Sequence, residues 1–178
     1  MSDVNHKFYM RYCDINGGYV TSPPSAGGDI VVDEDKYLKE NKIDLEAYFV
    51  GLKYAKCEGL DTIGKPKNIY TETYCDAEKK RVYMPDNIAK KITNEPTTIT
   101  LTLYFVGENR ERVMEKFNEY VRNGFHKYWD TARKKAFVFC IEDEISVSNE
   151  LWYGSTPYIK CDYKLKNVSG KTEHVSEI

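Results

Sequence analysis

The chain has 178 residues, of which 26 are lysine or arginine and 28 are aspartate or glutamate, so its formal net charge is only −2. This length suits one domain, or one domain with an N-terminal extension, and it is sufficient to bury a real core. A near-neutral balance without a basic surplus argues against a dedicated duplex-DNA binder. The 15 tyrosines and 7 phenylalanines favour a β-rich protein, because aromatic residues are enriched in strands.

The cysteines are odd in number, widely separated and never spaced as Cys-x-x-Cys, so they predict no zinc, redox or disulfide framework. They are Cys13, Cys57, Cys75, Cys140 and Cys161. Free thiols are typical of a protein made in a reducing cytoplasm. The first residues lack the basic and apolar regions of a signal peptide, and no apolar run approaches the roughly 20 residues that span a bilayer. We therefore expect a soluble protein.

The N-terminal part is expected to be an arm. Residues 1–28 contain a short aromatic piece and then two glycine pairs and a proline pair, a density that disfavours a regular element. Asp33 to Glu40 has three acidic residues placed to begin a short helical turn. We assign residues 1–45 to an N-terminal arm or extension, residues 46–170 to the main domain and residues 171–178 to a polar tail.

Strands are predicted next. Alternating apolar residues predict a strand from about Tyr48 to Glu58. Ile69–Cys75 and Lys80–Met84 flank a polar turn and predict a hairpin. Pro85 to Pro96 is expected to be a connection.

The segment from Thr97 to Asp143 is expected to organise the fold. Thr97–Val106 alternates apolar residues with threonines and predicts a strand with one buried face. A helix from Arg110 to Asn123 should follow, because its apolar residues recur at helical spacing. They are Val113, Met114, Phe117, Tyr120 and Val121. Asn109 is its expected N-cap and Gly124 its expected C-terminal stop.

A hairpin and a final strand complete the predicted fold. Phe125 to Asp130 should turn through residues 131–134 and return as Lys135 to Ile141. Ser146 to Pro157 is expected to be a polar and aromatic loop. Ile159 to Leu165 alternates apolar and polar residues and predicts a strand with one buried face, followed by a mobile polar tail from Asn167. The fold class is thus α+β, mainly β: a β-sandwich or split barrel with one packed α-helix.

A catalytic interpretation has little support from the sequence. His126, Asp130 and Cys140 are the candidates, but a nucleophile needs a base and an oxyanion donor in convergent positions, and no glycine-rich nucleophile turn supplies them. Glu142–Glu144 lacks the ligand spacing of a calcium loop and is expected to be a solvated strand end. We predict no catalytic residue, no metal site and no cofactor. Lys160, Lys164 and Lys166 are expected to protect an exposed strand from aggregation, with Asp162 interrupting the basic stripe.

The assembled pattern resembles phage tail proteins of the tail-tube and distal-tail group, which share one β-sandwich with a single packed helix. Four features carry the resemblance over roughly residues 48–170. They are the strand Ile99–Gly107 leading into the helix Arg110–Asn123, the hairpin Tyr128–Lys135, the segment Leu151–Tyr158, and the final strand ending at Asn167.

The resemblance implies a structural subunit that forms a ring, commonly a hexamer, around a channel through which DNA passes without specific recognition. Its partners would be further copies and other tail proteins, and it would reside in the host cytoplasm during synthesis and in the virion tail after assembly. The resemblance carries no catalytic residues. Either the arm or the Ser146–Pro157 loop is expected to lie at a subunit boundary. The candidate interface residues are Phe8, Tyr9, Tyr12, Trp152, Tyr153, Pro157 and Tyr158.

Two other functions stay open. One is a carbohydrate- or ligand-binding β-sandwich in which Trp152, Tyr153 and Tyr158 form a stacking platform. The other is a small enzyme that uses His126 and Cys140. Solution mass discriminates a ring subunit from a binding module, and substrate or metal screens address the enzyme.

Overall fold

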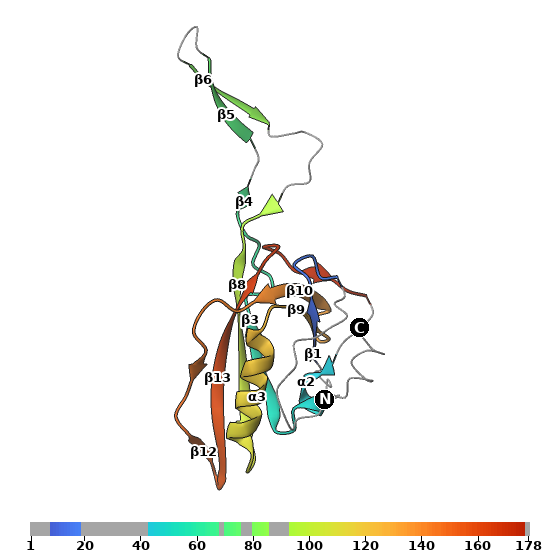
Figure 1. The fold of residues 1–178 in the computed structure, drawn as a ribbon, viewed down its shortest axis with the longest axis vertical. Coiled ribbons are helices and arrows are strands. Elements are labelled where there is room, and N and C mark those ends of the chain that lie inside the picture. The colour runs from blue at the N-terminus through green and yellow to red at the C-terminus, as the bar shows by residue number, and fades with distance from the viewer. Residues whose placement is uncertain (1–7, 19–42, 68–69, 76–79, 86–92, 177–178) are drawn as a thin grey trace.

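A computed structural model of the chain describes residues 8–18, 43–67, 70–75, 80–85 and 93–176. The predicted fold class is confirmed: the protein is α+β and mainly β, with an antiparallel sheet and helices (Figure 1). The strands of the main sheet are β1 (Phe8–Cys13), β2 (Ile43–Asp44), β3 (Leu52–Glu58), β8 (Thr97–Val106), β9 (Phe125–Asp130), β10 (Lys135–Cys140), β11 (Ser146–Val147), β12 (Leu151–Tyr153), β13 (Thr156–Asn167) and β14 (Glu173–His174). The described helices are α2 (Leu45–Tyr48) and α3 (Arg110–Arg122).

The main sheet curls into a split barrel. Its strands follow the order β2-β1-β9-β10-β13-β8-β3, with β11 and β12 on β13 and β14 on β10. β1, next to the β2 end of this order, approaches β3 at the other end, because the rings of Phe8 on β1 and Tyr54 on β3 lie 5.3 Å apart. α2 contacts both β1 and β3, and the Glu46 carboxylate accepts a hydrogen bond of 2.8 Å from the Tyr54 backbone N–H at the strand edge. The seam of the barrel is therefore closed by side chains rather than by a strand ladder.

β8 and β13 form the longest ladder of the sheet and confirm the predicted alternation. They pair from Tyr158 opposite Val106 to Asn167 opposite Thr97. Their inward residues are fully or almost fully buried: Ile99, Leu101, Leu103, Phe105, Ile159, Cys161, Tyr163 and Leu165. On the outer face, the Thr102 hydroxyl donates to the Asp162 carboxylate at 2.5 Å, so the acidic interruption of the lysine stripe is itself fixed.

α3 packs on the inner side of this ladder, as its apolar stripe predicts. It contacts β8, β13 and β3 (Figure 1). Phe117 has no exposed surface, and its ring lies 5.2 Å from that of Tyr163 and 5.3 Å from that of Phe49. Gly124 has φ +73, which confirms the expected left-handed stop. Asn109 occupies the N-cap position, as expected, but its side chain makes no capping hydrogen bond.

β9 and β10 form the predicted hairpin, and β1 extends it. Lys135 lies opposite Asp130 and Phe139 opposite His126. β1 pairs along the whole of β9, with Phe8 opposite Asp130 and Cys13 opposite Phe125. Residues 1–28 were expected to hold no regular element, and this is wrong for Phe8–Cys13. An aromatic-rich strand can form beside glycines when an edge of a preformed hairpin supplies its hydrogen bonds.

Three other expectations are corrected by the described residues. The strand expected from Tyr48 begins only at Leu52, because α2 and a turn at Gly51 (φ +99) precede it. Ser146–Pro157 is not a loop throughout, since β11 and β12 both pair with β13. The tail expected to be mobile is anchored: Asn167 is fully buried, and β14 pairs with β10.

A two-stranded hairpin projects from the barrel. It is named the arm from here on and is separate from the N-terminal arm expected at residues 1–45. β5 (Tyr70–Cys75) and β6 (Lys80–Pro85) pair with each other in a sheet of their own, which confirms the predicted hairpin strands. β4 (Pro66–Lys67) and β7 (Thr93–Asn94) pair at its base. Figure 1 shows this arm extending along the long axis of the molecule, beyond the upper end of β8. The turn at 76–79, the segment 86–92 and the helical turn expected at Asp33–Glu40 lie outside the described residues.

Candidate functional site

The three residues considered for catalysis do not converge. His126 and Asp130 lie on the inner face of β9 and have no exposed surface. Cys140 is half-buried at a position of β10 that follows the inward Phe139 and therefore points to the outer face. His126 and Cys140 thus lie on opposite sides of the sheet, and the geometry of a nucleophile with its base is not formed.

His126 is a core residue under the C-terminal end of α3. Its Nε2 lies 3.0 Å from the Asn123 carbonyl oxygen, and its ring lies 4.3 Å from that of Tyr12 and 4.9 Å from that of Tyr120. Burial lowers the pKa of His126 to about 4 from 6.5, although hydrogen bonds to the backbone of Asn123 and Tyr120 oppose the shift. The imidazole is therefore neutral at pH 7 and acts as a packed aromatic ring.

Asp130 belongs to a polar cluster at the barrel seam that the sequence did not reveal. Its Oδ1 accepts a hydrogen bond of 2.9 Å from the Arg133 backbone N–H. Burial, followed by the charge of Asp130, raises the pKa of the nearby Cys57 to about 12, and burial raises that of Tyr128 well above its usual value. The Cys57 thiol on β3 and the Tyr128 hydroxyl on β9 therefore stay protonated near neutral pH, and the interaction between these two side chains joins the two strands. This gives the cluster a structural role.

The four cysteines whose side chains the structure describes carry no reactive signature. Cys13, Cys57, Cys140 and Cys161 are free. Burial raises the pKa of Cys13 and of Cys161 to about 11. A nucleophilic or metal-binding cysteine needs the thiolate, which a raised pKa disfavours.

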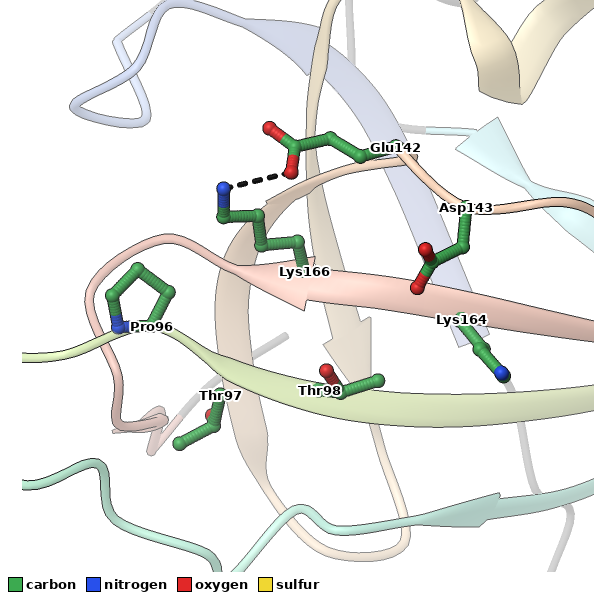
Figure 2. A pocket seen from close by; sticks show the side chains of 7 residues that line it. All are labelled: Pro96, Thr97, Thr98, Glu142, Asp143, Lys164 and Lys166. Atoms are coloured by element: carbon green, nitrogen blue, oxygen red, sulfur yellow. Dashed lines mark hydrogen bonds and ion pairs between the residues drawn. The ribbon is translucent and has the colours of Figure 1, made fainter.

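A polar hollow of about 200 Å³ lies on the outer face where β8 and β13 meet the loop after β10. It is lined by Pro96, Thr97, Thr98, Glu142, Asp143, Lys164 and Lys166. Figure 2 shows the Lys166 ammonium directed at the Glu142 carboxylate, at 2.8 Å, and this hydrogen bond is the main cause of the raised pKa of Lys166. Two carboxylates and two ammonium groups balance each other here, so the hollow is a solvated set of charges and not a selective site for one ion.

The exposed aromatic residues of β12 form the clearest feature of the surface. Trp152 and Tyr153 are 62% and 84% exposed, and Leu151 is 38% exposed. β12 turns into β13 through Gly154, which has φ +61, as a hairpin with glycine at its first turn position allows. Large apolar side chains this exposed at a strand edge are typical of an interaction surface.

The other candidate interface residues are less available. Pro157 is half-buried opposite Trp152. Tyr158 is half-buried too, and its ring packs edge-on against that of Tyr104 with centroids 5.3 Å apart. Trp152 and Tyr153 are consecutive residues of β12 and point to opposite faces, so the three aromatic residues do not form one flat platform.

The N-terminal candidates lie within the chain's own sheet. Phe8 is fully buried and Tyr12 is 4% exposed, and the Tyr12 hydroxyl donates a hydrogen bond of 2.9 Å to the Tyr120 carbonyl oxygen of α3. Tyr9 is half-buried and lies opposite Trp129. The expectation that Phe8 and Tyr12 reach a neighbouring subunit is therefore wrong, because β1 completes this chain's own core.

At the base of the arm, three segments of the backbone are in close contact, at Gly64–Lys65, Glu95 and Gly170. The Gly64 N–H donates to the Gly170 carbonyl oxygen at 2.7 Å, and the Glu95 N–H donates to the Lys65 carbonyl oxygen at 2.8 Å. A Cβ atom at Gly64 or Gly170 would lie 1.8 Å or 2.1 Å from the Glu95 carbonyl oxygen. Only glycine permits this approach, so the C-terminal turn holds the arm where it leaves the barrel.

No protein-family model matches the chain, and the search of curated proteins found no match. Within the described ranges, no cluster of histidine, cysteine, aspartate and glutamate is arranged to hold a metal ion. No described helix has the length and apolar character needed to cross a membrane.

Proposed function

We propose that the chain is a structural subunit of a phage or prophage tail, which forms a ring around a DNA channel at the tail tube or distal tail. The observation that carries the proposal is the arm that projects from a closed split barrel with one packed helix (Figure 1). An isolated two-stranded hairpin is at best marginally stable in water. In the proposed assembly, the arm gains stability from contact with another subunit.

The exposed edge of β12 supports the same proposal. Trp152 and Tyr153 lie on a short strand that pairs only with β13 among the described strands. Apolar side chains at such an edge are a liability in a monomer, and a closed assembly covers them. In this role the chain binds further copies and other tail proteins, has no catalytic residue or cofactor, and lets DNA pass without specific contacts.

The test is whether the purified full chain assembles into closed rings. Light scattering at increasing concentration should give a mass several times that of one chain, and negative-stain electron microscopy should show particles with a central channel. A monomer at all concentrations up to the millimolar range, without rings, would refute the proposal.

The alternative is a carbohydrate-binding module, and the exposure of Trp152 and Tyr153 is the observation that favours it. Aromatic faces of this kind stack on apolar ligand surfaces. A monomeric protein that binds a glycan on an array, and loses that binding in Trp152→Ala, would support this function in place of the first.

A further inference from the structure

Two surfaces of different character lie on opposite sides of the β3-β8-β13 part of the sheet. The acidic-aromatic surface, beside β13, consists of Asp143, Val147, Leu151, Trp152 and Tyr153. The basic surface, beside β3, consists of Val50, Lys53, Ile63 and Lys65.

Both surfaces expose apolar residues that nothing in the described part of the chain covers. Val50 is 79% exposed and Ile63 is 69% exposed on the basic surface. They compare with Trp152 at 62% and Tyr153 at 84% on the acidic-aromatic surface. Each surface therefore has apolar area to bury against a partner.

The charged residues that belong to the two surfaces have opposite signs. Lys53 and Lys65 are exposed and form no ion pair with any described residue, and the same holds for Asp143. Two neighbouring lysines are already paired, since Lys56 contacts Glu58 at 3.0 Å and Lys166 contacts Glu142 at 2.8 Å. The basic surface thus presents Lys53 and Lys65, and the acidic-aromatic surface presents Asp143, which shares its polar hollow with the exposed Lys164.

The strand registers place the matching residues at the same levels along the sheet. At the end of the sheet where β12 pairs with β13, the Val106 N–H donates to the Gly51 carbonyl oxygen, Val106 pairs with Tyr158, and Tyr158 pairs with Leu151. This row sets Val50 level with the β12 aromatic residues.

At the other end, Lys65 bonds Glu95 through its carbonyl group. Asp143 shares the polar hollow with Pro96 and Thr97, the residues that follow Glu95. A copy translated sideways across the strands therefore brings Val50 to the level of Trp152 and Lys65 to the level of Asp143.

We propose that the partner of the acidic-aromatic surface is the basic surface of a second copy of this chain, in a head-to-tail interface that repeats around the ring. The inference rests on the proposed ring-forming function and adds which two surfaces meet. Apolar contacts between Val50 and the β12 residues close one end of the interface, and Lys65 with Asp143 closes the other.

The sheet is long enough for such an interface. β13 has 12 residues, which extend over roughly 40 Å at about 3.3 Å per residue. A contact of that length needs a width of only about 20 Å to reach the ~800 Å² per partner of a stable interface. The interface is heterologous, because each copy contributes a different surface, and such contacts generate rings when the rotation closes.

The test disables one surface at a time in the full chain. Variant A carries Trp152→Ala and Tyr153→Ser, and variant B carries Val50→Asp and Lys53→Glu. Ile15→Ser is the matched control, because Ile15 is 54% exposed but lies in the turn after β1, on neither surface. Circular dichroism and thermal melting should be unchanged in all three.

In light scattering at matched concentration, A alone and B alone should be monomeric, while Ile15→Ser should retain the mass of the unmodified chain. An equimolar mixture of A and B should give a species of twice the monomer mass and no larger, since each variant keeps one intact surface. If B alone forms a dimer while A does not, the interface joins two β12 surfaces and the inference is overturned. A monomeric unmodified chain overturns it as well.

The outcome separates the inference from the function on which it rests. Rings that persist in variants A and B would refute the proposed interface between the two surfaces, but not the proposed ring-forming function. A mass lowered in both variants, with no channel in micrographs of the unmodified protein, would support the surfaces and refute the tail function.

A charge exchange tests the other end of the interface. Lys65→Asp and Asp143→Lys should each weaken association at least several-fold at low salt. The double variant should recover it, because residue 65 of one copy faces residue 143 of the next. A double variant no better than the single ones would contradict this pairing.

Discussion

Replacing Phe117 by alanine tests whether α3 is held to the sheet by its apolar stripe. The side chain has no exposed surface, and its ring contacts those of Phe49, Tyr163 and Phe105, with centroids 5.3, 5.2 and 6.1 Å away. Losing the buried ring costs about 1.5–3 kcal/mol in transfer free energy. A residual cavity on the order of 100 Å³ adds about 2 kcal/mol at roughly 24 cal/mol per Å³. The free energy of unfolding should therefore fall by about 3–5 kcal/mol.

Urea denaturation followed by circular dichroism measures this change. Glu115→Ala is the control, because Glu115 is exposed on the same helix and alanine has the higher helix propensity; its effect should stay within about 0.5 kcal/mol. A loss below about 1 kcal/mol in Phe117→Ala would mean that α3 does not depend on this contact, and the reasoning from burial would be refuted.

Burial lowers the folded-state pKa of His126 to about 4 from 6.5, so protonation favours the unfolded chain. The stability present above pH 6.5 should fall by about 3 kcal/mol as the pH drops to 4, a loss that urea melts of His126→Gln should lack. Gly170→Ala (φ +71, against the Glu95 carbonyl oxygen) should lower the melting temperature well below that of Gly154→Ala (φ +61, in open space). Cys140→Ala should leave ring assembly unchanged in light scattering; an activity that vanishes while the melting temperature holds would overturn the structural interpretation. Tyr12→Phe removes a buried hydrogen bond to the Tyr120 carbonyl oxygen and should cost about 1–3 kcal/mol in denaturant melts.

The elements that the sequence predicts well are those whose pattern is local. β8 and β13 alternate at every residue, and α3 repeats its apolar positions at helical spacing between Gly107 and Gly124. In each case a single continuous segment contains the periodic apolar pattern that defines its buried face. β9 and β10 follow for the same reason, since only a short turn separates them.

The elements that were missed depend on distant partners. β1 is a strand because β9, more than a hundred residues later, offers an edge. β12 and β14 have only 3 and 2 residues, too few for a periodic pattern, and they exist because β13 and β10 bond them. The contact of Cys57 with Tyr128 and Asp130 likewise arises only when the sheet curls, which no local pattern encodes.

The candidate surface was predicted in part. An exposed Trp-Tyr pair in a polar segment is a visible signal, and the structure places Trp152 and Tyr153 in solvent. The basic surface has a weaker signal, because Val50 lies within the run that predicts a strand from Tyr48, and its exposure becomes evident only once Leu52 is seen to begin β3. A glycine after an apolar residue, as in Val50-Gly51, is the one local hint of a turn there.

The alternation of β13 separates the residues that fold the chain from those that can meet a partner. Its inward residues pack against α3, while Lys160 and Lys164 lie on the outer face beside the proposed interface. A slip of one residue in the pairing with β8 would exchange the two sets and place lysines in the core. The long ladder with β8, the short strands on the opposite edge and the hydrogen bond of Tyr163 to Asn118 of α3 at 2.6 Å together oppose that slip. Because the register is fixed from both sides, substitutions on the outer face can alter association while the core stays intact, so assembly and stability can be measured as separate quantities in one set of variants.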